Sequence, residues 1–135
     1  MNELGQQIPS SPAKEPKMDR SDFDYQTDLI IKFSEIQRSD IEKMFLNMEM
    51  DEREKEYWKK KFETEFDSNP MVAEKLNFFA LLSKMSEEEK VQLYHFSMRC
   101  RYIPGIHDFR SHFLLYLQLF PNEQTWWKKA RLNLL

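Results

Sequence analysis

Apolar residues recur at helical spacing in one segment of this chain after another. The clearest stripe covers about 100° of helical arc, as an amphipathic helix with one buried face requires. It consists of Ile106, Phe109, Phe113, Tyr116, Leu117 and Phe120. Further stripes follow one another from residue 25 to residue 102, and a last one contains Trp126, Trp127, Ala130 and Leu134. The pattern predicts an all-α protein, a compact bundle of six or seven short helices.

Start and stop signals separate these stripes. Ser, Asp and Asn side chains cap the first amides of a helix, and proline fits a first turn but ends the helix before it. Ser39 with Glu42, and Ser86 with Glu89, have the spacing of a capping box. Further boundaries are expected at Ser21–Asp22, Asp51, Pro70, Pro104–Gly105 and Pro121.

The expected fifth helix, residues 87–102, is apolar on two sides. Its first face contains Leu93, Phe96 and Cys100, and its second contains Val91, Tyr94, Met98 and Tyr102. A helix that is apolar on two sides buries both of them. We therefore expect this helix to be the central one of the bundle.

Composition bounds the domain organisation. The 135 residues include two glycines and six prolines, too few for a β-rich fold with many tight turns. Hydrophobic residues make up 41% and aromatic residues 14%, which is enough for the core of one domain. We place that domain at residues 21–135. Pro9, Pro12 and Pro16, among few apolar residues, mark residues 1–20 as a disordered tail.

A sequence echo leaves the connectivity of the bundle open. The segments Met50–Lys55 (MDEREK) and Met85–Lys90 (MSEEEK) align at an offset of 35 residues. Stacked helical hairpins repeat at such a period. Unrelated short helices with similar caps also recur at similar spacing, so both interpretations stand.

Cysteine content and hydropathy suggest a location. One cysteine forms no intramolecular disulfide, which suits a reducing compartment. The first residues lack the apolar core of a secretory signal, and no apolar run nears the roughly 18 residues of a membrane span. We expect a cytoplasmic or nuclear protein that makes no membrane contact.

All three histidines and the single cysteine lie between His95 and His112. On regular helices His95 and Cys100 diverge by about 140°, as do His107 and His112, so neither pair chelates a metal ion. Cys100 shares its helix face with the apolar residues Leu93 and Phe96, which is typical of a structural cysteine. Asp108 and His112 are one turn apart and are expected to pair on the helix surface. We therefore expect no catalytic residue, metal or cofactor, and an enzyme built on Cys100 and a histidine is the least favoured hypothesis.

Apolar surface favours a protein partner. Eight methionines and eleven phenylalanines supply adaptable surface of the kind that binds helices and peptides. The predicted function is a non-enzymatic interaction module, an adaptor or scaffold, that binds a partner peptide or helix or forms a homodimer. Candidate partner-binding residues are Trp126, Trp127, Arg131, Phe78 and Tyr102. Ser11, in a Ser-Pro-x-Lys sequence, is a candidate phosphorylation site.

Charge leaves a second function open. Residues 22–69 hold fourteen acidic and eight basic residues, a net charge of −6 that does not suit a phosphate backbone. Residues 104–135 hold two acidic and four basic residues, a net charge of +2. The alternative is therefore a nucleic-acid-associated helical domain that uses the basic C-terminal third. Its contacts would be Arg99, Arg101, Arg110, Lys128, Lys129 and Arg131.

Overall fold

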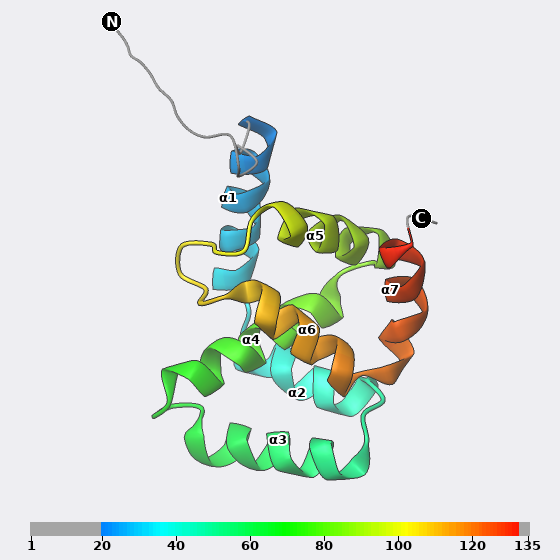
Figure 1. The fold of residues 1–135 in the computed structure, drawn as a ribbon. Helices are drawn as coiled ribbons and strands as arrows, with labels where there is room; N and C mark the ends of the chain where they lie inside the picture. Colours follow the sequence, from blue (N-terminus) through cyan, green and yellow to red (C-terminus); the bar gives the residue numbers. More distant parts are fainter. Residues whose placement is uncertain (1–19, 133–135) are drawn as a thin grey trace, which may run out of the picture.

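The computed structural model of the protein describes residues 20–132 and contains within them seven α-helices and one 3₁₀ helix (Figure 1). These are α1 (Arg20–Ser34), α2 (Arg38–Asn47), α3 (Glu52–Glu65), α4 (Pro70–Lys84), α5 (Glu87–Arg99), α6 (Phe109–Leu119), η1 (Pro121–Glu123) and α7 (Gln124–Arg131). The only β-type pairing in this range is an isolated bridge between Ile103 and Ile106. The all-α fold class is confirmed.

Three sequence predictions fall wholly or partly outside the described residues. Of the expected tail, residues 1–20, only Arg20 is described, and it begins α1. Ser11, the candidate phosphorylation site, and Leu134, the last residue of the C-terminal stripe, lie outside the described range. None of the helices within residues 20–132 combines the length and the apolar character that crossing a membrane demands.

Helix α4 lies at the centre of the bundle. It packs against α1, α2, α3 and α6, and five consecutive residues from Phe78 to Leu82 are buried. The prediction that α5 is central is wrong, because α5 packs mainly against α6 and α7 and ends at Arg99. On its second apolar face Met98 is 60% exposed, and Tyr102, beyond the helix end, is 66% exposed. The sequence of α4, apolar on nearly every side, explains why α4 takes the interior place.

Most of the helix starts agree with the cap signals. Asp51 caps α3 by accepting the amide of Arg53, and Asn69 caps α4, which opens with Pro70. The Ser86–Glu89 capping box is present in both directions at the start of α5. The predicted box at Ser39–Glu42 is wrong.

At α2 the cap lies two residues earlier than expected. The helix begins at Arg38, and the carboxylate of Asp40 accepts the amide of Gln37 at 2.8 Å. Asp40 stands at the third helical position of this earlier register, so its shorter carboxylate takes the part expected of Glu42.

Helix α6 begins three residues later than its apolar stripe. Pro104 and Gly105 form a turn closed by the Ile103–Ile106 bridge, and Gly105 has φ +88°, which glycine adopts without steric cost. Asp108 also has positive φ, at 44°, and caps the helix by accepting the amide of Ser111. All six residues of the predicted stripe are nevertheless buried.

A buried carboxylate joins the last three helices. Glu123 in η1 accepts hydrogen bonds from Tyr116 (3.0 Å), from the indole of Trp126 (3.2 Å) and from Lys90. Burial, together with the neighbouring Glu123 charge, raises the pKa of Tyr116. These contacts tie α5, α6 and α7 together at one point, because a buried charge must be paired and hydrogen-bonded.

The spacing of 35 residues appears in the structure as two pairs of helices. The pair α3–α4 follows Asp51 and the pair α5–α6 follows Ser86; each pair is in contact, and the pairs meet where α4 packs on α6. The two pairs thus meet through their second helices, α4 and α6, and both interpretations of the sequence echo stay predictions.

Candidate functional site

Two of the five predicted partner-binding residues belong to the core. Phe78 and Trp126 are buried, so neither offers surface to a partner, and their assignment to a binding surface is corrected. Phe78 packs between the rings of Phe33 and Phe109, on α1 and α6. The other three residues reach the surface: Tyr102 and Arg131 are exposed, and Trp127 is half-buried with the Arg131 guanidinium 4.6 Å from its ring centre.

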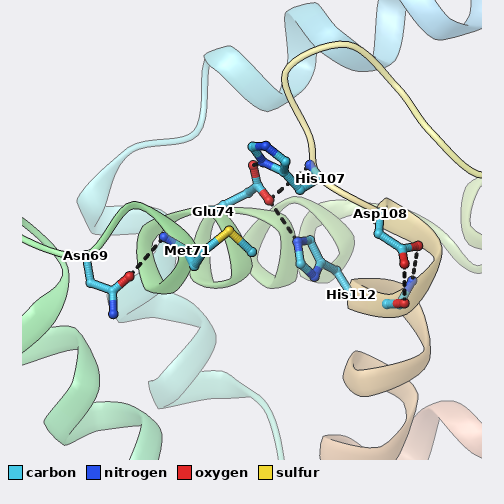
Figure 2. Close-up of polar contacts among 7 residues, drawn as sticks. Asn69, Met71, Glu74, His107, Asp108 and His112 are labelled. Carbon is cyan, nitrogen blue, oxygen red and sulfur yellow. Dashed lines mark hydrogen bonds and ion pairs between the residues drawn. The ribbon is translucent and has the colours of Figure 1, made fainter.

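The histidines at 107 and 112 do not diverge, contrary to the prediction from helical spacing. Figure 2 shows both imidazoles directed at Glu74 of α4. Nδ1 of His107 lies 3.1 Å from Oε2, Nε2 of His112 lies 2.9 Å from Oε1, and the amide of His107 donates to Oε1 at 3.0 Å. The prediction fails because α6 begins at Phe109, which leaves His107 in the preceding loop and free of helical geometry.

The expected pair of Asp108 with His112 is also absent. Asp108 instead accepts two hydrogen bonds from Arg101, at 3.2 and 3.0 Å, and one from the Ser111 hydroxyl at 2.8 Å. The hydrogen bond from Arg101 lowers the pKa of Asp108 to about 2. His112 therefore takes its partner from α4, across the core, rather than from its own helix.

Electrostatics explain why Glu74 stays ionised. Burial alone opposes its charge, but the hydrogen bonds from His112 and His107 outweigh burial and lower the pKa of Glu74 below its ordinary 4.5. A carboxylate only accepts, so Nδ1 of His107 and Nε2 of His112 each carry the proton in this arrangement. The side chain of His112 is 5% exposed and that of His107 is 80% exposed. The cluster thus fastens the loop before α6 to α4.

The thiol lies apart from this cluster. Cys100, at the C-terminal end of α5, is half-buried, and burial raises the pKa of its thiol. Its Sγ lies 3.1 Å from the carbonyl oxygen of Tyr102 and 4.0 Å from Oε1 of Gln26, neither of which is a base strong enough to activate it. His95 lies half-buried with its ring against Tyr94. Within residues 20–132 no group of three histidine, cysteine or acidic side chains is placed to hold a metal ion.

Half of the basic residues considered for nucleic acid are engaged within the fold. Arg99 pairs with Asp22 at 2.7 Å, Arg101 forms the bidentate contact with Asp108, and Arg110 donates to the carbonyl of Ser97 at 2.6 Å. The remaining three lie exposed on α7: Lys128, Lys129 and Arg131.

The clearest open site is a groove between α2 and α3. The two helices run in opposite directions, and both pack on α4 (Figure 1). Between them lies a cavity of about 380 Å³, open to solvent, whose lining comes from these two helices alone. We call it the α2–α3 groove; it is lined by Arg38, Glu42, Phe45, Leu46, Lys55, Lys59, Phe62 and Glu63.

The base of the α2–α3 groove is apolar and preformed. The rings of Phe45 and Phe62 lie 6.1 Å apart and are buried in the protein core. At one end Arg38 closes the groove: its guanidinium lies 5.0 Å from the ring centres of Phe62 and Phe66 and contacts Asp67 at 3.1 Å. The base is therefore fixed by packing and does not depend on a ligand.

At the other end Leu46 projects into solvent with 81% of its surface exposed, the largest exposure among the large hydrophobic residues of the described chain. A second hollow of about 420 Å³ lies beyond it, and Leu46 and Lys55 line both hollows. A single exposed apolar residue is ordinary, but Leu46 borders two hollows and so adds apolar surface to a concave region of the protein. A signal for it existed in the sequence: Leu46 lies off the buried face of α2, which carries Ile41, Met44 and Phe45.

Comparison of the chain with protein-family models, with curated proteins and with solved structures gives no match.

Proposed function

We propose that this protein is a non-enzymatic interaction module, an adaptor or scaffold domain, that binds a helix or peptide of a partner protein in the α2–α3 groove. The observation that carries the proposal is the high exposure of Leu46, 81%, beside a preformed cavity with the rings of Phe45 and Phe62 at its base. Apolar cavities with a few polar groups at the rim are the usual form of such binding sites.

The reactive residues give little support to the competing class of enzymes. Glu74 already accepts three hydrogen bonds, and among residues 20–132 no base contacts the Cys100 thiol. A catalytic carboxylate or thiol must instead be free to exchange protons with a substrate. We place the module in the cytoplasm or nucleus, where its one free cysteine stays reduced.

Site-specific photo-crosslinking in cells tests the proposal. A photoreactive amino acid at position 46 should give a discrete crosslinked partner, because Leu46 borders the groove. The matched control is position 98, since Met98 is also apolar and 60% exposed but belongs to α5. Equal crosslinking from both positions, or none from position 46, would contradict the proposal. A crosslink between two copies of the chain would identify the homodimer instead.

Nucleic acid remains the second candidate function, because Lys128, Lys129 and Arg131 are exposed together on α7. Binding of short DNA and RNA should then weaken steeply with added salt and be lost in a Lys128→Glu/Lys129→Glu variant. The same variant should keep the position-46 crosslink if the groove binds protein. No binding of either nucleic acid at low ionic strength would end this alternative.

A further inference from the structure

We infer that the occupant of the α2–α3 groove is an amphipathic helix of a partner protein that carries two acidic side chains, one turn apart, beside its apolar stripe. The inference rests on the proposed function and adds to it the conformation and the charge of the partner. Three properties of the groove support it: its shape, the order of the charges along its rim, and the lack of ion pairs, within the described residues, at every rim charge except Arg38.

The shape of the groove suits a helix. Helices α2 and α3 run in opposite directions and both pack on α4, and in helical bundles a third helix packs between two such neighbours. Addition of a β-strand requires an open sheet edge, and residues 20–132 contain no sheet. Polyproline ligands dock on exposed aromatic rings, whereas Phe45 and Phe62 are buried at the base.

The charges along the rim follow the antiparallel order of the helices. At the open end Leu46 lies on the α2 side and Lys55 on the α3 side, as their shared lining of both hollows shows. One turn closer to the closed end, Glu42 lies on the α2 side and Lys59 on the α3 side. At the closed end Arg38 is already paired with Asp67.

Lys55 and Lys59 are therefore the cations that a partner would meet beside Leu46. Both line the groove four residues apart on α3, so they occupy neighbouring turns of one helix face. Within the described residues neither forms an ion pair, and neither does Glu42 or Glu63. Acidic side chains at the same spacing on a partner helix would meet both lysines, while its apolar stripe covers Leu46 and Phe45. Basic residues of the partner helix would meet Glu42 on the α2 side of the groove and Glu63 near its closed end.

Selection from a display library of helical peptides tests the inference without a known partner. The full chain is the target, and peptides that still bind a Leu46→Asp variant are discarded. The surviving peptides should combine apolar residues at i, i+3, i+4 and i+7 with Glu or Asp one turn apart on one flank. Circular dichroism of a selected peptide in the complex should report a helix.

Charge reversal on α3 then measures the contribution of the two lysines. Lys55→Glu/Lys59→Glu should weaken binding of a selected peptide roughly tenfold, because two exposed ion pairs are lost and like charges are introduced. The matched control, Arg53→Glu/Lys60→Glu, changes the same net charge on exposed residues of α3 that do not line the groove, and its effect should stay below about twofold. Thermal unfolding of both variants checks that each is folded.

The outcomes separate the inference from the proposed function. Peptides that need Leu46 but show no acidic preference, or that bind equally well after the Lys55 and Lys59 reversal, overturn the inference and leave the groove as a binding site. Selected peptides that bind in an extended conformation also overturn it. If no peptide depends on Leu46, or if only a second copy of the chain competes, both the inference and the proposed partner helix fail.

Discussion

The Glu74 cluster and the α2–α3 groove are built from opposite kinds of residue and are used in opposite ways. The cluster contains groups that are common in active sites, yet Glu74, His107 and His112 use their hydrogen bonds on one another. The groove contains phenylalanine, leucine and charged residues of both signs, which are common on any helix. Yet it is open to solvent, and within the described residues its two lysines form no ion pair.

This comparison shows that residue type identifies a site less well than whether its polar, charged and apolar side chains already have partners in the fold. A buried donor or acceptor that has found a partner stabilises the fold and is costly to disturb. An exposed apolar side chain beside a preformed cavity leaves surface area that a partner can still bury. Substitutions in the cluster should therefore change stability, and substitutions in the groove should change binding.

The largest effect is expected at the carboxylate of the cluster. Glu74→Ala should lower the free energy of unfolding by about 2–4 kcal/mol, because the buried imidazole of His112 and the amide of His107 lose their acceptor. Urea denaturation measures this. The control is Glu63→Ala at the groove rim, where Glu63 is exposed and the change should stay within about 0.5 kcal/mol. Similar losses for the two variants would remove the distinction between the sites.

The two histidines of the cluster should differ from each other. His112→Ala removes a buried ring that also packs against Phe78, with ring centres 6.0 Å apart, and should cost about 1–3 kcal/mol. His107→Ala removes an exposed ring but keeps the backbone amide that donates to Glu74, so about 0.5 kcal/mol is expected. The same urea titrations compare them, and a larger loss at His107 would show that the ring contact, not burial, controls the link.

Acid should weaken the contribution of Glu74 to stability. The pKa of Glu74 is lowered in the folded protein, so its contribution to stability is present above the ordinary value of 4.5 and is lost as the pH falls through the folded pKa. The difference in unfolding free energy between the wild type and Glu74→Gln should therefore shrink from pH 6 toward pH 3. Chemical denaturation at several pH values checks this, and a difference that grows in acid would reverse the assigned direction.

The smallest effect on stability is expected at the most exposed leucine. Leu46→Gln should change the free energy of unfolding by no more than about 0.5 kcal/mol, because the side chain buries almost nothing in the monomer. The same change should weaken binding of groove-selected peptides. A loss of stability above about 1 kcal/mol would mean that Leu46 supports the fold and that the groove is a structural cleft.

Short sequence signals predicted most of the helix starts correctly but misplaced the start of α6. The caps at Asp51, Ser86 and Pro70 act within three residues of chain, so the sequence alone reveals them. The start of α6 was misplaced because Ile106 continues the apolar stripe although it belongs to the preceding turn. Ile106 is buried because the loop before α6 packs against the core, and in the sequence this looks like one more residue of the helical stripe.

The candidate sites required contacts that periodicity does not encode. Phe78 was assigned to a surface because residues 78–82 have Phe-x-x-Leu-Leu spacing, and Trp126 because it lies on an amphipathic C-terminal helix. In the structure both rings pack against rings of other helices. The groove was missed because its two sides come from different helices, and only their common support on α4 sets the space between them.

The all-α class, most of the helix caps and the buried stripe of the sixth helix follow from the spacing of residues within one or two turns, so the amino-acid sequence is enough to predict them. Tertiary structure alone decided that His107 and His112 meet at Glu74, 33 and 38 residues earlier in the chain. It also decided that Leu46 remains exposed beside an open groove. Such contacts depend on which helices pack on α4. The sequence pattern does not reveal them, because the free energy of burial is gained only when distant segments pack together.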